Sequence, residues 1–243
     1  MYTTLMQAWG RQHWWPAQSR FEVIVGAFLT QNTNWWNVES ALRKLRARRL
    51  LNIDAVRQVP VKQLEEAIRS SGYFRQKAIR LKNFVRFLDE CYGGSLATMF
   101  AQPTERLREQ LLTLNGIGPE TADSILLYAG QHSVFVVDAY TRRIAERHEI
   151  LPASAKYEEV RALFEAALSK AELVQECDAA QPSGACHSPS RMSRAPRTAL
   201  AQIYNEMHGL LVGVGKNYCL KSAPRCAMCP LQHLLASGGG RGV

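Results

Sequence analysis

Segments with a helical hydrophobic period follow one another along nearly the whole chain of 243 residues. In each of them apolar side chains recur every three or four residues, which places them on one face of an α-helix. Glycines and prolines separate the segments and end each helix before the next begins. The segments comprise residues 21–29, 36–50, 61–70, 74–92, 104–112, 157–171 and 199–214. This pattern predicts an all-α fold, with residues 134–137 as an extended lead-in to a helix.

Basic residues outnumber acidic ones, because 30 Lys and Arg against 21 Asp and Glu give a net charge of +9. Such an excess favours a polyanionic partner, although solubility alone also accounts for it. Hydrophobic residues make up 47% of the chain, as in a globular protein. No apolar run reaches the roughly 18 residues of a membrane span, and no stretch resembles a signal peptide. We therefore expect a cytoplasmic monomer with no membrane partner.

A tight turn joins two of the expected helices at Leu-Asn-Gly-Ile-Gly-Pro, residues 114–119. Gly116 and Gly118 permit positive φ angles and close approach of another backbone. Pro119 suits the first position of a helix, and Ile117 is expected to anchor the turn in the core. Free N–H groups at the helix start favour an anion such as a DNA phosphate. An ordinary connection between helices is the simpler alternative.

A single carboxylate, Asp138, follows this turn by about 20 residues, in Val-Val-Asp-x-x-x-x-Arg at residues 136–143. With the turn at this spacing, the chain resembles the helix-hairpin-helix (HhH-GPD) superfamily of DNA glycosylases, in its endonuclease III-like group. The resemblance covers residues 14–234 apart from an insertion. It implies a two-domain, all-α helix-hairpin-helix fold that removes damaged bases from double-stranded DNA.

The resemblance also implies domain boundaries. Residues 21–130 are expected to form a six-helix barrel with the hairpin, and residues 1–20 with 131–236 a second helical domain. Residues 172–197 are rich in small and polar side chains and are expected to be a flexible insertion. A glycine-rich tail at residues 237–243 is expected to be disordered.

In this family the invariant acid aligns with Asp138. A carboxylate there stabilises the positive charge that develops on the sugar when the glycosidic bond breaks, and it can orient the attacking water. A helix N-cap is the simpler role for Asp138. Family members that also cleave the strand carry a lysine where this chain has Glu120. Because a carboxylate cannot form a Schiff base, we expect a monofunctional enzyme with weak or absent strand cleavage, and a solvent-facing Glu120. Another lysine that reaches the sugar is the alternative route to weak lyase activity.

Four of the five tryptophans flank the segment 21–29. The motif Trp-Trp-Pro-x4-Phe-Glu with Leu-Thr-Gln-Asn-Thr is similar to the 3-methyladenine DNA glycosylase branch, although packing in the core is the alternative. The resemblance places Trp14, Trp15, Pro16 and Trp35 in the base pocket, where aromatic faces stack on a flipped base. A lysine expected in that branch is replaced by Leu210, which leaves base selectivity open.

Other family positions are expected to contact DNA. Gln31 matches the residue that enters the gap left by the flipped base, and Lys77 is expected to contact a phosphate. Lys216, beside the cysteines near the C-terminus, is a further candidate for a phosphate contact.

Cysteines Cys219, Cys226 and Cys229 match the start of the family's iron–sulfur loop, C-x6-C-x2-C-x5-C. Four thiolates normally hold a [4Fe–4S] cluster, yet the fourth place is Leu235. His233 is the nearest substitute, and three cysteines with a histidine also suit zinc. Cys177 or Cys186 of the insertion is another possibility, as is a site without metal. Cys91 is expected to be an ordinary core residue.

The leading hypothesis is a monofunctional glycosylase that removes an alkylated purine such as 3-methyladenine. Removal of uracil or thymine from mispairs is an alternative, as is an oxidised-pyrimidine glycosylase with AP lyase activity, which Glu120 disfavours. A hypothesis of another class is a non-catalytic protein that binds damaged DNA.

Overall fold

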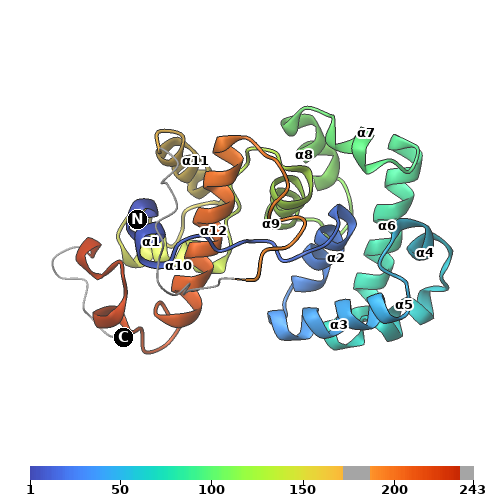
Figure 1. The fold of residues 1–243 in the computed structure, drawn as a ribbon, viewed down its shortest axis with the longest axis horizontal. Helices are drawn as coiled ribbons and strands as arrows, with labels where there is room; N and C mark the ends of the chain where they lie inside the picture. The colour runs from blue at the N-terminus through green and yellow to red at the C-terminus, as the bar shows by residue number, and fades with distance from the viewer. Residues whose placement is uncertain (172–186, 236–243) are drawn as a thin grey trace. The chain divides into compact units, whose positions relative to one another are not determined.

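The computed structural model describes residues 1–171 and 187–235, and over these ranges the chain is helical and contains no β-strand (Figure 1). The all-α prediction is therefore confirmed. None of the helices in the described ranges is both long and apolar enough to cross a membrane. Residues 172–186 of the expected insertion and the expected tail at 237–243 lie outside the described residues.

The chain divides into two compact units. The central unit comprises Ala17–His132, and the terminal unit comprises Met1–Pro16 with the described residues from Ser133 onward. The expected domain boundaries, after residues 20 and 130, lie a few residues from these divisions. Each unit is described separately below.

The central unit contains eight α-helices and two short helical turns. They are α2 (Arg20–Thr30), α3 (Trp35–Ala47), α4 (Ile53–Gln58), α5 (Val61–Ala67), η1 (Arg69–Ser71), α6 (Phe74–Tyr92), α7 (Leu96–Phe100), α8 (Thr104–Leu112), α9 (Pro119–Ser124) and η2 (Ile125–Gly130). The helical period predicted α6 and α8 to the residue. It missed α4 and α7, which are too short to show a period.

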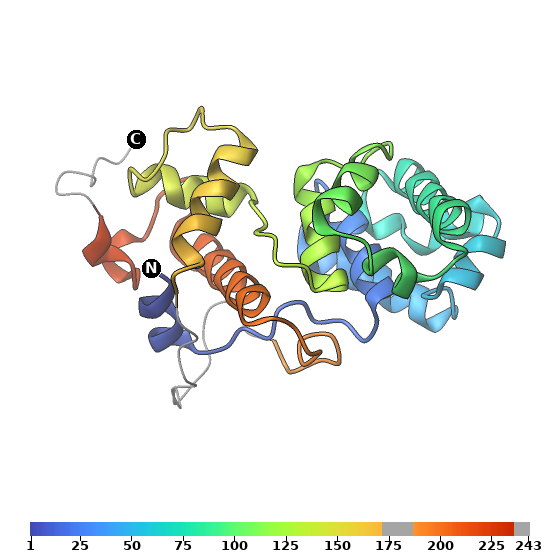
Figure 2. The same ribbon diagram turned by 90° about the horizontal axis from the view of Figure 1, so that it is seen from above.

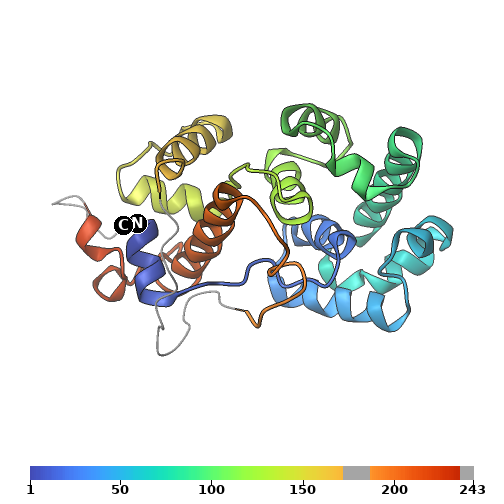
Figure 3. The same ribbon diagram turned by 45° about the horizontal axis from the view of Figure 1, so that its top comes forward.

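Helix α2 forms the core of the central unit, since every residue from Phe21 to Leu29 is buried. It contacts α3, α6, α9 and η2, and Figure 3 shows it enclosed by these neighbours. Ser19 caps its first turn by accepting a hydrogen bond from the Glu22 backbone N–H at 3.1 Å. Its apolar sequence thus reflects burial on all sides.

A buried ion pair holds the two helices of the hairpin together. Arg108 of α8 donates to both carboxylate oxygens of Asp123 in α9, at 2.6 and 3.2 Å. Such a two-point contact constrains the angle between the helices as well as their distance. The turn between them is therefore held from both sides.

The terminal unit is built around its longest helix, α12. Its elements are α1 (Tyr2–Trp9), α10 (Ala139–Arg147), α11 (Tyr157–Leu168), α12 (Ala199–Asn217), η3 (Cys226–Met228) and η4 (Gln232–Leu234). Helices α1, α10 and α11 all contact α12, and Figure 2 shows them around it. The prediction missed α1.

Residues 134–137 are extended and fully buried, as predicted. The Phe135 ring stacks on Phe164 of α11 with centroids 4.9 Å apart, and its backbone N–H donates to Glu165 at 2.9 Å. These contacts fix the approach of the chain to α10.

Helices α10 and α12 approach closely at a glycine. A Cβ atom on Gly215 would lie 2.3 Å from Cδ1 of the Tyr140 ring, so only glycine fits under this ring. The Arg143 guanidinium lies over the other part of the same ring, 5.2 Å from its centroid. The N-terminal end of α10 therefore packs against the C-terminal end of α12.

One expectation about packing was wrong, and the described part of the insertion makes contacts of its own. Within residues 187–197, Ser190 is buried and its hydroxyl donates to the Trp15 carbonyl at 3.2 Å. Arg197 donates to the Met192 carbonyl at 2.7 Å and closes this loop. Cys91 is exposed instead of lying in the core, because it falls on the outer face of α6.

Candidate active site

Asp138 is the N-cap of α10. Its Oδ1 accepts a hydrogen bond from the Thr141 backbone N–H at 2.7 Å, and its backbone is extended. The side chain is 13% exposed. Capping uses one carboxylate oxygen, so the structural role and a chemical role for Oδ2 are compatible.

The second oxygen faces a buried histidine. Nε2 of His208, in α12, lies 3.6 Å from Asp138 Oδ2, and the histidine side chain is only 6% exposed. Burial lowers the pKa of His208, while the nearby Asp138 carboxylate acts in the opposite direction. The net shift favours the neutral form of the imidazole that borders the carboxylate. The segment 201–209, which contains His208, is similar to the 3-methyladenine branch, but the sequence assigned no role to His208, which lies far from Asp138 along the chain.

Tryptophans 14 and 15 lie beside this pair. The Trp14 ring centroid is 6.1 Å from that of His208 and 5.5 Å from that of Trp15. Across the ring, His187 lies 5.3 Å away. The terminal unit thus brings Asp138 and the Trp-Trp-Pro segment together, and Pro16 ends that unit.

Lys216 lies at the same aromatic group. Its Nζ is 6.0 Å from the Trp14 ring centroid, and the side chain is exposed. This placement puts an amine near the predicted base pocket as well as near the cysteine loop, which its position in the sequence alone did not indicate. Leu210, where a lysine was expected, is fully buried.

The central unit holds the hairpin turn. Gly116 has φ +85° and Ile117 is buried, as predicted, and Pro119 is at the start of α9. Gly118 differs from expectation: its φ is −94° and its backbone is extended, so it serves as N-cap of α9. Glu120 is exposed, in agreement with a solvent-facing position.

Gln31 is bound to this turn. Its amide Nε2 donates to the Gly116 carbonyl at 2.8 Å and to Thr121 Oγ1 at 3.0 Å. Arg80 donates to Gln31 Oε1 at 2.7 Å, and its guanidinium covers Gly116 so closely that a Cβ there would lie 2.0 Å from Nε. Arg80, three residues after Lys77 on the same helix, was missed by the sequence analysis.

Lys77 does not reach the surface. It is 1% exposed, and its ammonium donates to the carbonyls of Leu29 and Ser71 at 2.9 and 2.6 Å. Burial, with a contribution from Arg80, lowers its pKa to about 8. The expected phosphate contact is therefore corrected: Lys77 ties α6 to the end of α2. Trp35, the remaining expected pocket residue, begins α3 in the central unit.

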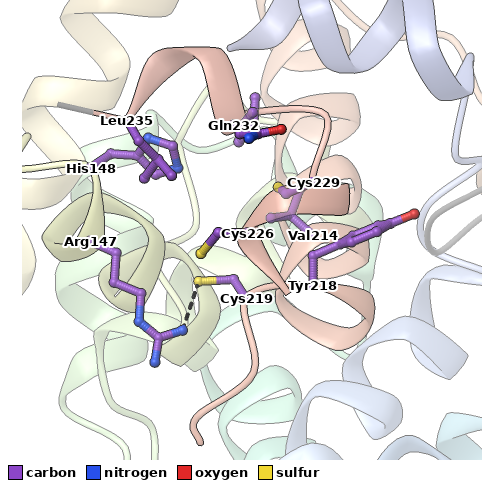
Figure 4. Close-up of a pocket in the computed structure, with 10 residues that line it drawn as sticks. Arg147, His148, Val214, Tyr218, Cys219, Cys226, Cys229, Gln232 and Leu235 are labelled. Carbon is purple, nitrogen blue, oxygen red and sulfur yellow. Dashed lines mark hydrogen bonds between the residues drawn. The ribbon is translucent and has the colours of Figure 1, made fainter. Parts of the chain in front are cut away.

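The cysteine loop forms a pocket in the terminal unit (Figure 4). Cys219, Cys226 and Cys229 line it. Burial raises the pKa of the Cys229 thiol, as do the neighbouring sulfurs of the other two cysteines, against a hydrogen bond from the Leu231 backbone. Leu235, at the fourth cysteine position, lines the same pocket.

The histidine in this pocket is not the expected one. His148 lines it, whereas His233 is exposed and is not among the lining residues. In the described ranges, no group of three or more His, Cys, Asp or Glu side chains is arranged to hold a single metal ion. The three thiols and one imidazole nevertheless share one pocket, and this donor set suits an iron–sulfur cluster.

Comparison with known proteins agrees with this geometry. The family model for the HhH-GPD superfamily of base excision DNA repair proteins matches residues 25–170. A protein of Methanocaldococcus jannaschii named "Putative DNA repair glycosylase MJ1434" is 39% identical over 238 residues, covering 98% of this chain and 94% of its own length.

Two solved structures share the fold. The 3-methyladenine DNA glycosylase of H. pylori, solved with 1,N6-ethenoadenine, has a TM-score of 0.68 and 28% identity, and the match covers 88% of this chain and 92% of that one. A non-covalent endonuclease III–DNA complex has a TM-score of 0.66 at 21% identity, and the match covers 91% and 85%. The chain therefore belongs to the HhH-GPD superfamily of base excision repair DNA glycosylases, in its endonuclease III-like group, and resembles the 3-methyladenine branch.

Proposed function

We propose that this DNA glycosylase hydrolyses the N-glycosidic bond of an alkylated purine such as 3-methyladenine in double-stranded DNA. Water is the nucleophile, the enzyme acts as a monomer, and the strand is left uncut. The observation that carries this proposal is that His208 lies near both Asp138 Oδ2, at 3.6 Å, and the Trp14 ring, at 6.1 Å between centroids, while helix capping uses only Asp138 Oδ1.

Asp138 supplies the chemistry in this proposal. Departure of the base builds positive charge on the sugar, and the carboxylate stabilises that charge while it also orients water. His208 lies 3.6 Å from Oδ2, and burial of its ring favours the neutral imidazole beside the carboxylate. The hydrogen bond from the Thr141 backbone N–H to Oδ1 orients the group.

The aromatic side chains supply the base site. A flipped base is bound by stacking, and Trp14 and Trp15, each 5% exposed, pack edge to face with ring planes 64° apart. The H. pylori enzyme, which carries the name 3-methyladenine DNA glycosylase, supports an alkylated purine as substrate. Pro16, which follows Trp15 in the same unit, is proposed to line this pocket.

The hairpin supplies the grip on DNA. Gly116 and Gly118 are proposed to present backbone N–H groups to a phosphate, whereas the Ile117 N–H donates to the Leu114 carbonyl at 3.0 Å and holds the turn. Gln31 is proposed to enter the space that the base leaves. Arg80 replaces Lys77 as the proposed cation of this region, because its guanidinium lies over the turn.

Asp138→Asn tests catalysis. Asparagine is an equally good N-cap, so α10 keeps its start while the negative charge is lost. Base release from a lesion panel is expected to fall about 100-fold or more while DNA affinity is retained. Asp54→Asn, at an exposed carboxylate, is the matched control. If the wild-type protein releases no base from the panel, the chain binds damaged DNA without catalysis.

Glu120 predicts no lyase step. Borohydride trapping on abasic DNA is expected to give no covalent adduct, because the Schiff-base lysine is absent from the hairpin. Lys216 is the second candidate for such an amine, since its Nζ lies by Trp14. A strong adduct that disappears in Lys216→Ala would replace the monofunctional assignment with a lyase that uses Lys216.

A further inference from the structure

The cysteine loop lacks one ligand where the chain has Leu235. Cys219, Cys226, Cys229 and Leu235 all line one pocket, so the leucine occupies the side of the pocket that the fourth cysteine would supply. Figure 4 shows His148 at this same side, next to Leu235. The imidazole Nδ1 of His148 lies 3.2 Å from the carbonyl oxygen of Leu234, which confirms the proximity.

This hydrogen bond defines which nitrogen of His148 can bind a metal. A carbonyl oxygen only accepts, so Nδ1 must be the donor and must carry the proton. In a neutral imidazole the lone pair is then on Nε2. A histidine that donates one N–H to a backbone carbonyl and offers its other nitrogen is the usual form of a metal-bound histidine.

Helix α10 holds His148 against the loop. His148 is the C-cap of this helix, and the preceding Arg147 donates to Cys219 Sγ at 3.3 Å and to the Leu220 carbonyl at 2.6 Å. One turn earlier, Arg143 donates to the Cys219 carbonyl at 2.7 Å. The end of α10 and the first cysteine are therefore fixed to each other.

We infer that His148, through Nε2, is the fourth protein ligand of a [4Fe–4S] cluster held by Cys219, Cys226 and Cys229. It takes the place of the cysteine that Leu235 replaces. His233, closer in sequence to the cysteines, is not a ligand because it lies outside the pocket. Metal content is measured without base release. A failure of this inference can therefore be told apart from a failure of the proposed glycosylase function.

A histidine ligand has a measurable consequence. Neutral imidazole in place of a thiolate removes one negative charge from the cluster, which raises its reduction potential, as histidines do in Rieske centres. The Arg147 hydrogen bond to Cys219 Sγ acts in the same direction. This cluster is therefore expected to be easier to reduce than the four-cysteine form in His148→Cys.

The experiment compares the full-length wild type, His148→Ala, His148→Cys and His233→Ala, each reconstituted anaerobically with iron and sulfide. The wild type is expected to bind about four iron atoms per chain and to absorb near roughly 400 nm. His148→Ala loses iron, His148→Cys keeps it at a lower reduction potential, and His233→Ala matches the wild type. Labelling histidine with ¹⁵N gives a nitrogen hyperfine coupling in the paramagnetic cluster of the wild type that His148→Cys lacks.

Several outcomes overturn the inference. One is equal iron content and equal spectra in the wild type and His148→Ala, and another is a loss of iron in His233→Ala but not in His148→Ala. The inference is also wrong if the wild type binds zinc or no metal, or if its cluster shows no coupling to a histidine nitrogen. If His148→Ala does not fold, His148→Cys and the labelled wild type still decide the assignment.

Discussion

Asp138 combines two tasks because its two carboxylate oxygens have different partners. Oδ1 caps α10 through Thr141, and Oδ2 faces the buried imidazole of His208 at 3.6 Å. The cap fixes the side-chain rotamer and thereby places the other oxygen beside His208. At the scale of the residue, the proposed catalytic group is thus oriented by the start of its own helix.

His208 makes stability depend on pH. Burial lowers its pKa below the ordinary 6.5, so the unfolded chain binds the proton more readily than the folded chain. Its contribution to stability is complete above about pH 6.5 and is lost as pH falls below that value. In His208→Asn, the loss of unfolding free energy between about pH 7.5 and about pH 5.5 is expected to be smaller than in the wild type. Urea unfolding at both pH values measures it, and equal losses contradict the prediction.

Helix α10 connects the two chemical regions of the terminal unit. Asp138 is its N-cap and His148 its C-cap, so the proposed catalytic group and the proposed cluster ligand lie at opposite ends of one short helix. A contact that moves α10 therefore affects both ends. At the scale of the element, the packing of α10 on α12 decides where these groups lie.

Gly215→Ala tests this packing. The new methyl group would lie 2.3 Å from Cδ1 of Tyr140, so the ring and α10 must move. We expect a loss of about 1–3 kcal/mol in unfolding free energy from overpacking, less the gain of up to about 1 kcal/mol from alanine's helix propensity. Gly118→Ala, whose Cβ meets no atom within 4 Å, is the control. Equal stability of Gly215→Ala and the wild type would show that α10 is not seated on this glycine.

The net charge of +9 acts at the scale of the whole molecule. Binding to DNA releases counterions, so affinity is expected to fall linearly with salt on logarithmic axes. Arg80→Ala is expected to reduce the slope by about 1 and to weaken binding on all sequences alike. Arg57→Ala changes the net charge equally but removes a cation already paired with Asp89, and its slope is expected to stay unchanged. Equal effects of both variants would mean that net charge, and not the hairpin, sets the affinity.

The sequence alone predicted the helical class, the hairpin turn and the capping carboxylate. These features depend on neighbours three or four positions apart and on glycine and proline geometry, which are local in the chain. The bounds of α6 and α8 were accordingly correct. Periods fail where a helix is short, and this is why α4 and α7 were missed.

Only the tertiary structure decided which long side chains face outward and which histidine joins the cysteines. Lys77 and Arg80 lie on one basic helix, yet the first is buried against two carbonyls and the second covers Gly116. His148 meets Leu234 across a separation of 86 residues, whereas His233, next to Leu234 in the sequence, is exposed and does not line the pocket. Such contacts depend on which helices pack together. The hydrophobic pattern of a helix shows which of its faces is buried, but it does not show which other helix covers that face.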